Sequence, residues 1–221
     1  MIEVSRHDAV FVLRMSEDEN RFQPAFLTAL HGALDEVEAA EGAAALVTTG
    51  AGKFYSNGLA LDAIAGKSGA EIAAYLDTVH QLFARVLAFP RVTVAAINGH
   101  AFAGGGMLAL AHDFRVMRND RGFFCLPEID LRLPLQPGMT SLIRARLPAQ
   151  TAHESIVTGR RYGAADALAA GIVDRAVAEA DVLPTAIAMA QELAGKDPAT
   201  LAALKQGLYA ATLRALQAAA S

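Results

Sequence analysis

The first half of the chain alternates short apolar runs with longer segments in which apolar residues recur every three or four positions. The short runs are rich in Val, Ala and Leu and predict buried strands at residues 9–13, 45–48 and 92–97. The longer segments predict helices at residues 24–41 and 70–89. Pro24 suits the first turn of a helix, and Gly42 and Pro90 suit positions just past a helix end. Alternating strands and helices predict an α/β core.

The second half is mostly helical in its pattern. It predicts a short apolar helix and then five more helices, at residues 106–111, 139–146, 149–158, 164–169, 182–193 and 198–218. It also predicts three short strands, at residues 114–117, 122–125 and 171–174. Two segments rich in Gly, Pro or polar residues, 49–69 and 126–138, are expected to be loops. Long loops within a compact domain are commonly functional.

Composition narrows the class of protein. The chain has 221 residues, of which 53% are hydrophobic and 19% charged, and its net charge is −4. This length and apolar content suffice for one sizeable hydrophobic core. The sequence has no run of Lys and Arg, so its charge pattern does not indicate nucleic-acid binding. The single cysteine, Cys125, excludes a disulfide framework and a zinc site built from cysteines.

The apolar surplus has two interpretations, a membrane span or subunit interfaces. The most apolar stretch, residues 92–111, is interrupted by Asn98-Gly99-His100 and by Gly104–Gly106. A buried strand, a turn and a helix that begins with glycines therefore describe it better than a bilayer span. Neither the mixed charge of residues 1–8 nor the C-terminal Ala-Ala-Ser matches a targeting signal, so we expect a cytoplasmic protein without a membrane segment.

Three segments carry candidate chemistry: residues 52–59, 98–106 and 126–130. The glycines at 104–106 allow close approach at a helix N-terminus, which suits a phosphate, a developing oxyanion or simply tight packing. They match neither a Walker loop nor a dinucleotide fingerprint. Glu128 has apolar neighbours, which favour a raised pKa and acid–base chemistry, although an ordinary exposed glutamate has the same local pattern.

Other catalytic patterns are weaker. Ser56, His100 and Asp113 supply the residue types of a hydrolase triad, but no Gly-x-Ser-x-Gly elbow accompanies them. His112 is expected to be a structural residue near a helix C-terminus. No pair of His or acidic residues has metal-ligand spacing, so we expect no metal site.

Taken together and in order, four segments resemble the crotonase superfamily, the enoyl-CoA hydratase/isomerase family. They are GKFYSNGLAL (52–61), VAAINGHAFAGGGMLALAHDFRVM (94–117), FFCLPEIDLRL (123–133) and GRRYGAADALAAGIVDRAV (159–177). The resemblance implies a ββα spiral core at residues 1–160 and a helical C-terminal trimerisation region at residues 161–221. It also implies a homotrimer or a dimer of trimers.

The resemblance further implies a site. The backbone N–H groups of Leu59 and Gly105 would form an oxyanion hole for a thioester carbonyl, and Glu128 stands where the family has the later of two catalytic glutamates. Hydratases in the family carry the earlier glutamate two residues after the Gly triplet, where this chain has Leu108. A single carboxylate can take a proton from C2 and return it at C4. The residues of these motifs also most resemble those of the shorter Δ3,Δ2-enoyl-CoA isomerases of fatty acid metabolism.

Four apolar side chains are expected to line the substrate pocket and keep water out: Phe102, Leu108, Phe124 and Leu126. Coenzyme A would be part of the acyl-CoA substrate, so the resemblance implies no separate cofactor, and the sequence does not identify the residues that bind it. Two alternatives stay open. One is another single-carboxylate reaction on the same fold, such as hydration or decarboxylation, and the other is a non-catalytic acyl-CoA-binding subunit.

Overall fold

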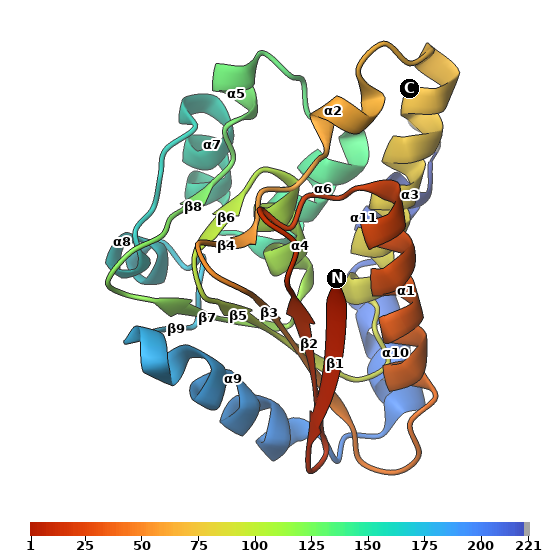
Figure 1. Ribbon diagram of the computed structural model, residues 1–221, viewed down its shortest axis with the longest axis vertical. Helices are drawn as coiled ribbons and strands as arrows, with labels where there is room; N and C mark the ends of the chain where they lie inside the picture. The colour runs from red at the N-terminus through yellow and green to blue at the C-terminus, as the bar shows by residue number, and fades with distance from the viewer. Residues whose placement is uncertain (219–221) are drawn as a thin grey trace.

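The computed structural model describes residues 1–218, which fold around two sheets of unequal size (Figure 1). The larger sheet has the strand order β1-β2-β3-β5-β7-β9. Its strands are β1 (Ile2–His7), β2 (Val10–Met15), β3 (Ala45–Gly50), β5 (Val92–Ile97), β7 (Phe114–Arg118) and β9 (Arg175–Val177). All neighbours pair in parallel except β1 and β2, which are antiparallel. Parallel strands need crossover connections, and the helices supply them.

A second, smaller sheet contains three short parallel strands in the order β4-β6-β8. They are β4 (Phe54–Ser56), β6 (His100–Phe102) and β8 (Phe124–Cys125). Each follows a strand of the larger sheet along the chain, because β4 follows β3, β6 follows β5 and β8 follows β7. A helix comes after each such pair, so the chain winds through repeated strand–strand–helix units. This confirms the predicted ββα spiral with a helical C-terminal region.

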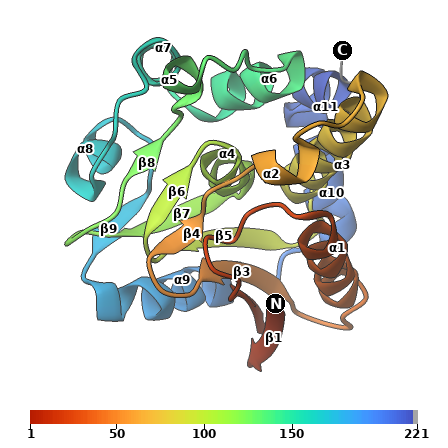
Figure 2. The same cartoon turned by 45° about the horizontal axis from the view of Figure 1, so that its top comes forward.

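The helices lie on both sides of the larger sheet. They are α1 (Pro24–Glu38), α2 (Leu61–Ile64), α3 (Gly69–Leu87), α4 (Gly104–Ala111), α5 (Glu128–Leu131), α6 (Pro137–Arg146), α7 (Ala149–Thr158), α8 (Ala164–Ala169), α9 (Glu179–Leu193), α10 (Pro198–Leu208) and α11 (Ala210–Gln217). Figure 2 shows α9 along one face of the sheet, where Val182, Ala186 and Ala190 pack on the valines of β2, β3, β5 and β7. On the opposite face, α4 lies at the centre of the main core.

Helix α4 is buried along its whole length. All eight of its residues are buried, as expected for a helix that is apolar all round. Cations lie at its C-terminal end, because Arg115 and Arg146 both donate to the carbonyl oxygen of His112, the residue that follows the helix, at 3.0 and 2.7 Å. Positive charge is favourable at a helix C-terminus, so the two arginines stabilise α4 at this end.

Several short elements were not predicted. β1 has only two half-buried apolar residues, Ile2 and Val4, between polar ones, and it forms because it pairs with β2. β4 and α2 lie in the expected loop at 49–69, and α5 lies in the one at 126–138. Elements of two to four residues are too short to show a periodic pattern.

The C-terminal part differs from the prediction at two places. Residues 171–174 form a turn after α8, with Gly171 at φ 70°, and the last strand is β9 at 175–177. The helix expected at 198–218 is divided at Tyr209 into α10 and α11. β9 and α9 both lie beyond residue 160 yet belong to the larger sheet and its cover. The domain boundary at 160 and the trimerisation role of 161–221 stay predictions, and residues 219–221 lie outside the described part.

The apolar stretch at residues 92–111 is accounted for by β5, β6 and α4. Among residues 1–218, no helix combines the length and the apolar character needed to cross a membrane.

Candidate active site

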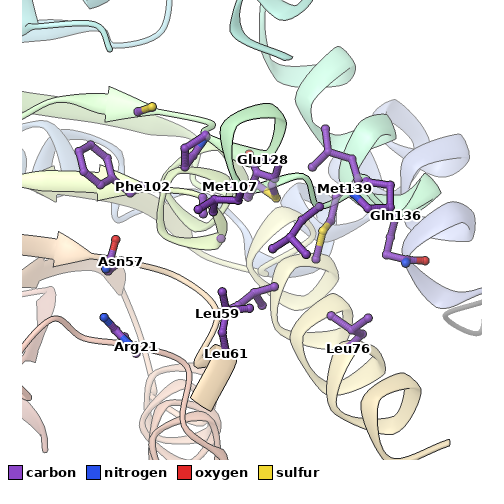
Figure 3. Close-up of a pocket in the computed structure, with 18 of the residues that line it drawn as sticks. Arg21, Asn57, Leu59, Leu61, Leu76, Phe102, Met107, Glu128, Gln136 and Met139 are labelled. Carbon is purple, nitrogen blue, oxygen red and sulfur yellow. The ribbon is translucent and has the colours of Figure 1, made fainter. Parts of the chain in front are cut away.

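A cavity of about 510 Å³ opens between α2 and α3 on one side and α5 and α6 on the other, beside the start of α4 (Figure 3). Most of its wall is apolar, and the charged side chains among its described lining residues are Arg21, Glu128 and Arg161. Apolar walls with a few placed polar groups are typical of sites for small organic ligands. The cavity therefore suits a ligand with a long apolar part.

Glu128 is the first residue of α5 and points into this cavity. Figure 3 shows it near Met107 and Met139, which line the same wall. Its Oε2 atom is buried and has no hydrogen-bond partner among the described residues. Burial raises the pKa of Glu128 to about 7, although its own backbone N–H acts in the opposite direction. The prediction of a desolvated carboxylate is therefore supported, although Ile129 beside it is 53% exposed and does not cause the desolvation.

Leu59 and the Gly triplet come together beside the cavity, where Leu59 and Gly104 are lining residues and Gly105 lies directly behind Gly104 in the chain. Leu59 follows β4, and Gly105 is the second residue of α4. Gly58 has φ 76°, and a Cβ placed on it would lie 2.5 Å from the backbone N of Gly104 and 2.9 Å from that of Gly105. Within residues 1–218, neither the N–H of Leu59 nor that of Gly105 donates to a protein acceptor. Two backbone donors are thus left free in neighbouring segments.

Close packing makes glycine necessary at position 105. A Cβ there would lie 2.1 Å from the carbonyl oxygen of Ser56, closer than any real contact. The two interpretations of the triplet, close packing and free N–H groups at a helix N-terminus, are therefore both present in one structure.

The residue before α4 has an unusual backbone. Ala103 has φ 50° and ψ −124°, a conformation that costs energy for any residue with a Cβ. Its N–H donates to the carbonyl oxygen of Cys125 at 2.9 Å, which joins it to β8, and it provides no side-chain cap for α4. Such strain is found mostly at functional sites.

Three of the four side chains expected in the pocket lie elsewhere. Phe102 lines the cavity, but Leu108, Phe124 and Leu126 are not among its lining residues and are at most 1% exposed. Phe124 and Leu126 instead pack against Gly106, 3.1 and 3.4 Å from where its Cβ would be. Successive helix residues point about 100° apart, so Met107 faces the cavity and Leu108 faces the core.

The sequence did not single out the other residues of the wall, although Asn57 lies in the candidate segment 52–59. They are Arg21, Asn57, Leu61, Ile64, Ile72, Leu76, Leu131, Leu133, Leu135, Gln136, Met139 and Arg161, with smaller contributions from neighbouring residues. Ile72 and Leu76 carried a signal, because they stand four residues apart on the apolar face of α3. Arg21 and Arg161 carried none, because isolated surface cations are ordinary in any sequence.

The other candidate chemistry is not assembled. The hydroxyl of Ser56 donates to the carbonyl oxygen of Asn20 at 2.7 Å, and Asp113 pairs with Lys205 at 2.7 Å. His100 packs between the rings of Phe54 and Phe102. Ser56, His100 and Asp113 therefore do not form a triad, and residues 1–218 contain no cluster of three or more His, Cys, Asp or Glu that could hold a metal ion.

Cys125 lines the cavity as a buried thiol. Burial raises its pKa to about 11, so it stays protonated near neutral pH and is a poor nucleophile.

Comparison with known proteins gives a consistent set of relatives. The model of the enoyl-CoA hydratase/isomerase family matches residues 5–221. Enoyl-CoA delta isomerase 3 of Arabidopsis thaliana is 32% identical over 220 residues, covering 95% of this chain and 92% of that protein. Carnitinyl-CoA dehydratase of Escherichia coli is 38% identical over 161 residues, 72% of this chain and 61% of that protein. The crystal structure of human mitochondrial delta3-delta2-enoyl-CoA isomerase superimposes with a TM-score of 0.89 at 29% identity, over 96% of this chain and 84% of that one.

Proposed function

Because the chain belongs to the enoyl-CoA hydratase/isomerase family, we propose that it is an isomerase that moves the double bond of an enoyl-CoA from position 3 to position 2. One observation carries the proposal. Among the described residues that line the cavity, Glu128 is the only carboxylate. Moving a double bond needs one group that takes a proton and gives it back, whereas hydration in this family uses a pair of carboxylates.

The proposed reaction is a proton transfer through an enolate. Glu128 removes a proton from C2 of the 3-enoyl thioester, the electron pair of the C2–H bond becomes part of a dienolate, and the negative charge extends to the thioester oxygen. The N–H groups of Leu59 and Gly105 donate to that oxygen. The protonated Glu128 then delivers its proton to C4, which leaves a double bond between C2 and C3 and restores the carboxylate. No other atom or electron enters, so the reaction needs no cofactor besides the CoA of the substrate.

The environment of Glu128 suits both halves of this cycle. A base whose pKa lies near the operating pH is ionised often enough to accept a proton and, once protonated, is acidic enough to return it. With a pKa raised to about 7 by burial, Glu128 meets that condition. The reaction also requires that the negative charge on the thioester oxygen be stabilised. Two preorganised N–H donors do this, and losing one such donor in comparable sites costs about 3–4 kcal/mol.

Two observations favour isomerisation over hydration. Leu108, where the hydratases carry a glutamate, is an apolar core residue in this chain. An isomerase of Arabidopsis thaliana is also similar over nearly its whole length. The similarity to a carnitinyl-CoA dehydratase covers 61% of that protein and keeps addition or removal of water as the second candidate.

The test is conversion of a 3-enoyl-CoA to the 2-enoyl-CoA, compared between the wild type and Glu128→Gln. We expect the variant to lose about 10³-fold or more in kcat, within the range known for removal of a general base. Glu192→Gln, an exposed glutamate on α9, is the matched control and should keep wild-type activity.

Each other outcome contradicts part of the proposal. Unchanged kcat in Glu128→Gln would remove Glu128 as the base. Addition of water to a 2-enoyl-CoA, without isomerisation of the 3-enoyl-CoA, would make the protein a hydratase. Tight binding of acyl-CoA with no turnover of either substrate would make it a binding subunit.

A further inference from the structure

A row of buried polar side chains runs behind the candidate site. Tyr55, Thr48 and His112 are at most 2% exposed, and they are joined end to end. The Tyr55 hydroxyl is 2.8 Å from Oγ1 of Thr48, which is 2.9 Å from Nε2 of His112. Nδ1 of His112 is 2.8 Å from the carbonyl oxygen of Leu108. Every polar atom of these three side chains is thus in a hydrogen bond.

The direction of each bond follows from the chemistry of the groups. A carbonyl oxygen only accepts, so Nδ1 of His112 carries a hydrogen. Burial holds the pKa of His112 down at about 3, so the ring is neutral and Nε2 is an acceptor. The Thr48 hydroxyl must donate to it, and having one hydrogen it can only accept from Tyr55. The row therefore runs one way, from the Tyr55 O–H to the Leu108 carbonyl.

The groups around His112 favour its neutral form. Arg115 and Arg146 both donate to its carbonyl oxygen, and Lys205 also acts on the ring from α10, where it pairs with Asp113. All three cations disfavour a further positive charge on the imidazole. The row keeps one hydrogen-bond direction for this reason.

The row connects the two segments that hold the free N–H groups. Tyr55 belongs to β4, four residues before Leu59, and its carbonyl oxygen accepts from the side chain of Asn20 at 3.0 Å. His112 is the C-cap residue that directly follows α4, the helix whose second residue is Gly105. Thr48 on β3 lies between them. A change in the spacing of β4 and α4 would stretch or bend these bonds.

We propose that Tyr55, Thr48 and His112 are positioning residues that hold the Leu59 and Gly105 N–H groups at one mutual distance and orientation for the thioester oxygen. The proposal rests on the proposed function. Apolar packing is not directional and tolerates small displacements, whereas hydrogen bonds of 2.8–2.9 Å fix both distance and angle. Preorganised donors need that accuracy, because displacements well under 1 Å weaken the stabilisation of an oxyanion.

The experiment compares two neighbouring threonines of β3. Thr48→Val keeps the side-chain shape and breaks the row. Thr49→Val removes an equally buried hydroxyl, which donates to the carbonyl oxygen of Ala96 at 3.0 Å and takes no part in the row. We expect Thr48→Val to lower kcat about tenfold with KM changed less than twofold, while Thr49→Val keeps kcat within about twofold at a similar loss of Tm. Thr48→Ser, which restores the hydroxyl, should recover most of the loss.

A second readout does not depend on turnover. The C=O stretching band of a saturated acyl-CoA thioester, measured by difference infrared spectroscopy, moves to lower wavenumber when the oxygen accepts hydrogen bonds. We expect a smaller displacement in Thr48→Val than in the wild type and an unchanged one in Thr49→Val. If Thr48→Val does not fold, Tyr55→Phe removes only the first hydroxyl and should show the same change with a smaller amplitude.

The outcomes separate the two proposals. A wild type that does not isomerise would reject the proposed function, yet the infrared comparison would still test the row. Equal kcat losses in Thr48→Val and Thr49→Val, or a thioester band in Thr48→Val identical to that of the wild type, would overturn the positioning role.

Discussion

Two helices beside the cavity, α4 and α5, differ sharply in how they are held. All eight residues of α4 are buried, and arginines lie at its C-terminal end. None of the four residues of α5 is fully buried, and its Ile129 and Leu131 are 53% and 49% exposed. Local stability follows packing, so α4 belongs to the most stable part of the fold and α5 to a less stable part.

The difference matches what each side has to do. Hydrogen-bond donors for an oxyanion must not move, which suits a helix fixed inside the core. Apart from Glu128, the residues that α2, α3 and α5 contribute to the cavity wall are apolar, and a ligand is held there by contact area rather than by direction. We therefore expect mutations near α4, like mutations of Glu128 itself, to change the rate of the reaction, and mutations of the apolar residues of the wall to change which substrates are accepted.

Among the variants that test this difference, Gly105→Ala is expected to have the largest effect. Its new Cβ would lie 2.1 Å from the carbonyl oxygen of Ser56, so β4 and α4 must separate and the two N–H groups move apart. We predict a loss of kcat of about 10²-fold or more, measured as isomerisation of a 3-enoyl-CoA. Gly207→Ala in α10 is the matched control, because nothing lies within 4 Å of its Cβ position. Wild-type kcat in Gly105→Ala would show that the close approach is not needed.

A smaller effect is expected from Leu76→Trp. Leu76 is a half-buried residue of α3 in the cavity wall, and Trp would fill part of the space opposite Met139. We predict that kcat/KM for long acyl chains falls about tenfold relative to short ones, which corresponds to about 1.4 kcal/mol of lost contact. Leu208→Trp, at a side chain that is 73% exposed, should leave the ratio unchanged. An equal fall for all chain lengths would contradict a role in substrate choice.

The smallest effect is a pH-dependent change in stability. Because the folded protein raises the pKa of Glu128 to about 7, the folded state binds more protons than the unfolded state between about pH 4.5 and 7. Glu128 therefore destabilises the fold progressively as the pH rises through this window. We predict that Glu128→Gln is more stable than the wild type by about 1–2 kcal/mol at pH 8 and not at pH 4. Urea unfolding at the two pH values measures this, and equal differences at both would mean that the carboxyl is not desolvated.

The sequence allowed the glycines and the carboxylate of the site to be predicted more fully than the residues that line the cavity. The glycines at 58 and 104–106 have few alternatives, because a Cβ at Gly58 or Gly105 would collide with backbone. Glu128 was recognisable as a carboxylate among apolar residues, and the family of four ordered motifs is confirmed by the match over residues 5–221.

The walls depended on long-range packing. The strands β4, β6 and β8 determine which face of α4 lies toward the cavity. Each has only two or three residues, too few for their hydrophobic pattern to predict all three strands and their packing. Leu108, Phe124 and Leu126 were therefore assigned to the pocket although they face the core. The homotrimer or dimer of trimers and the cytoplasmic location stay predictions.

The strained residue before α4 has a consequence for ligand binding. Ser, Thr, Asp and Asn are the preferred residues before a helix because their side chains accept a hydrogen bond from the first turn, but Ala103 has no such group. The first turn of α4 is thus left incomplete, and a thioester oxygen that accepts from Gly105 would serve as its missing N-cap. Substrate and helix would then stabilise each other. The amide hydrogens of residues 104–106 should exchange more slowly with solvent once an acyl-CoA is bound.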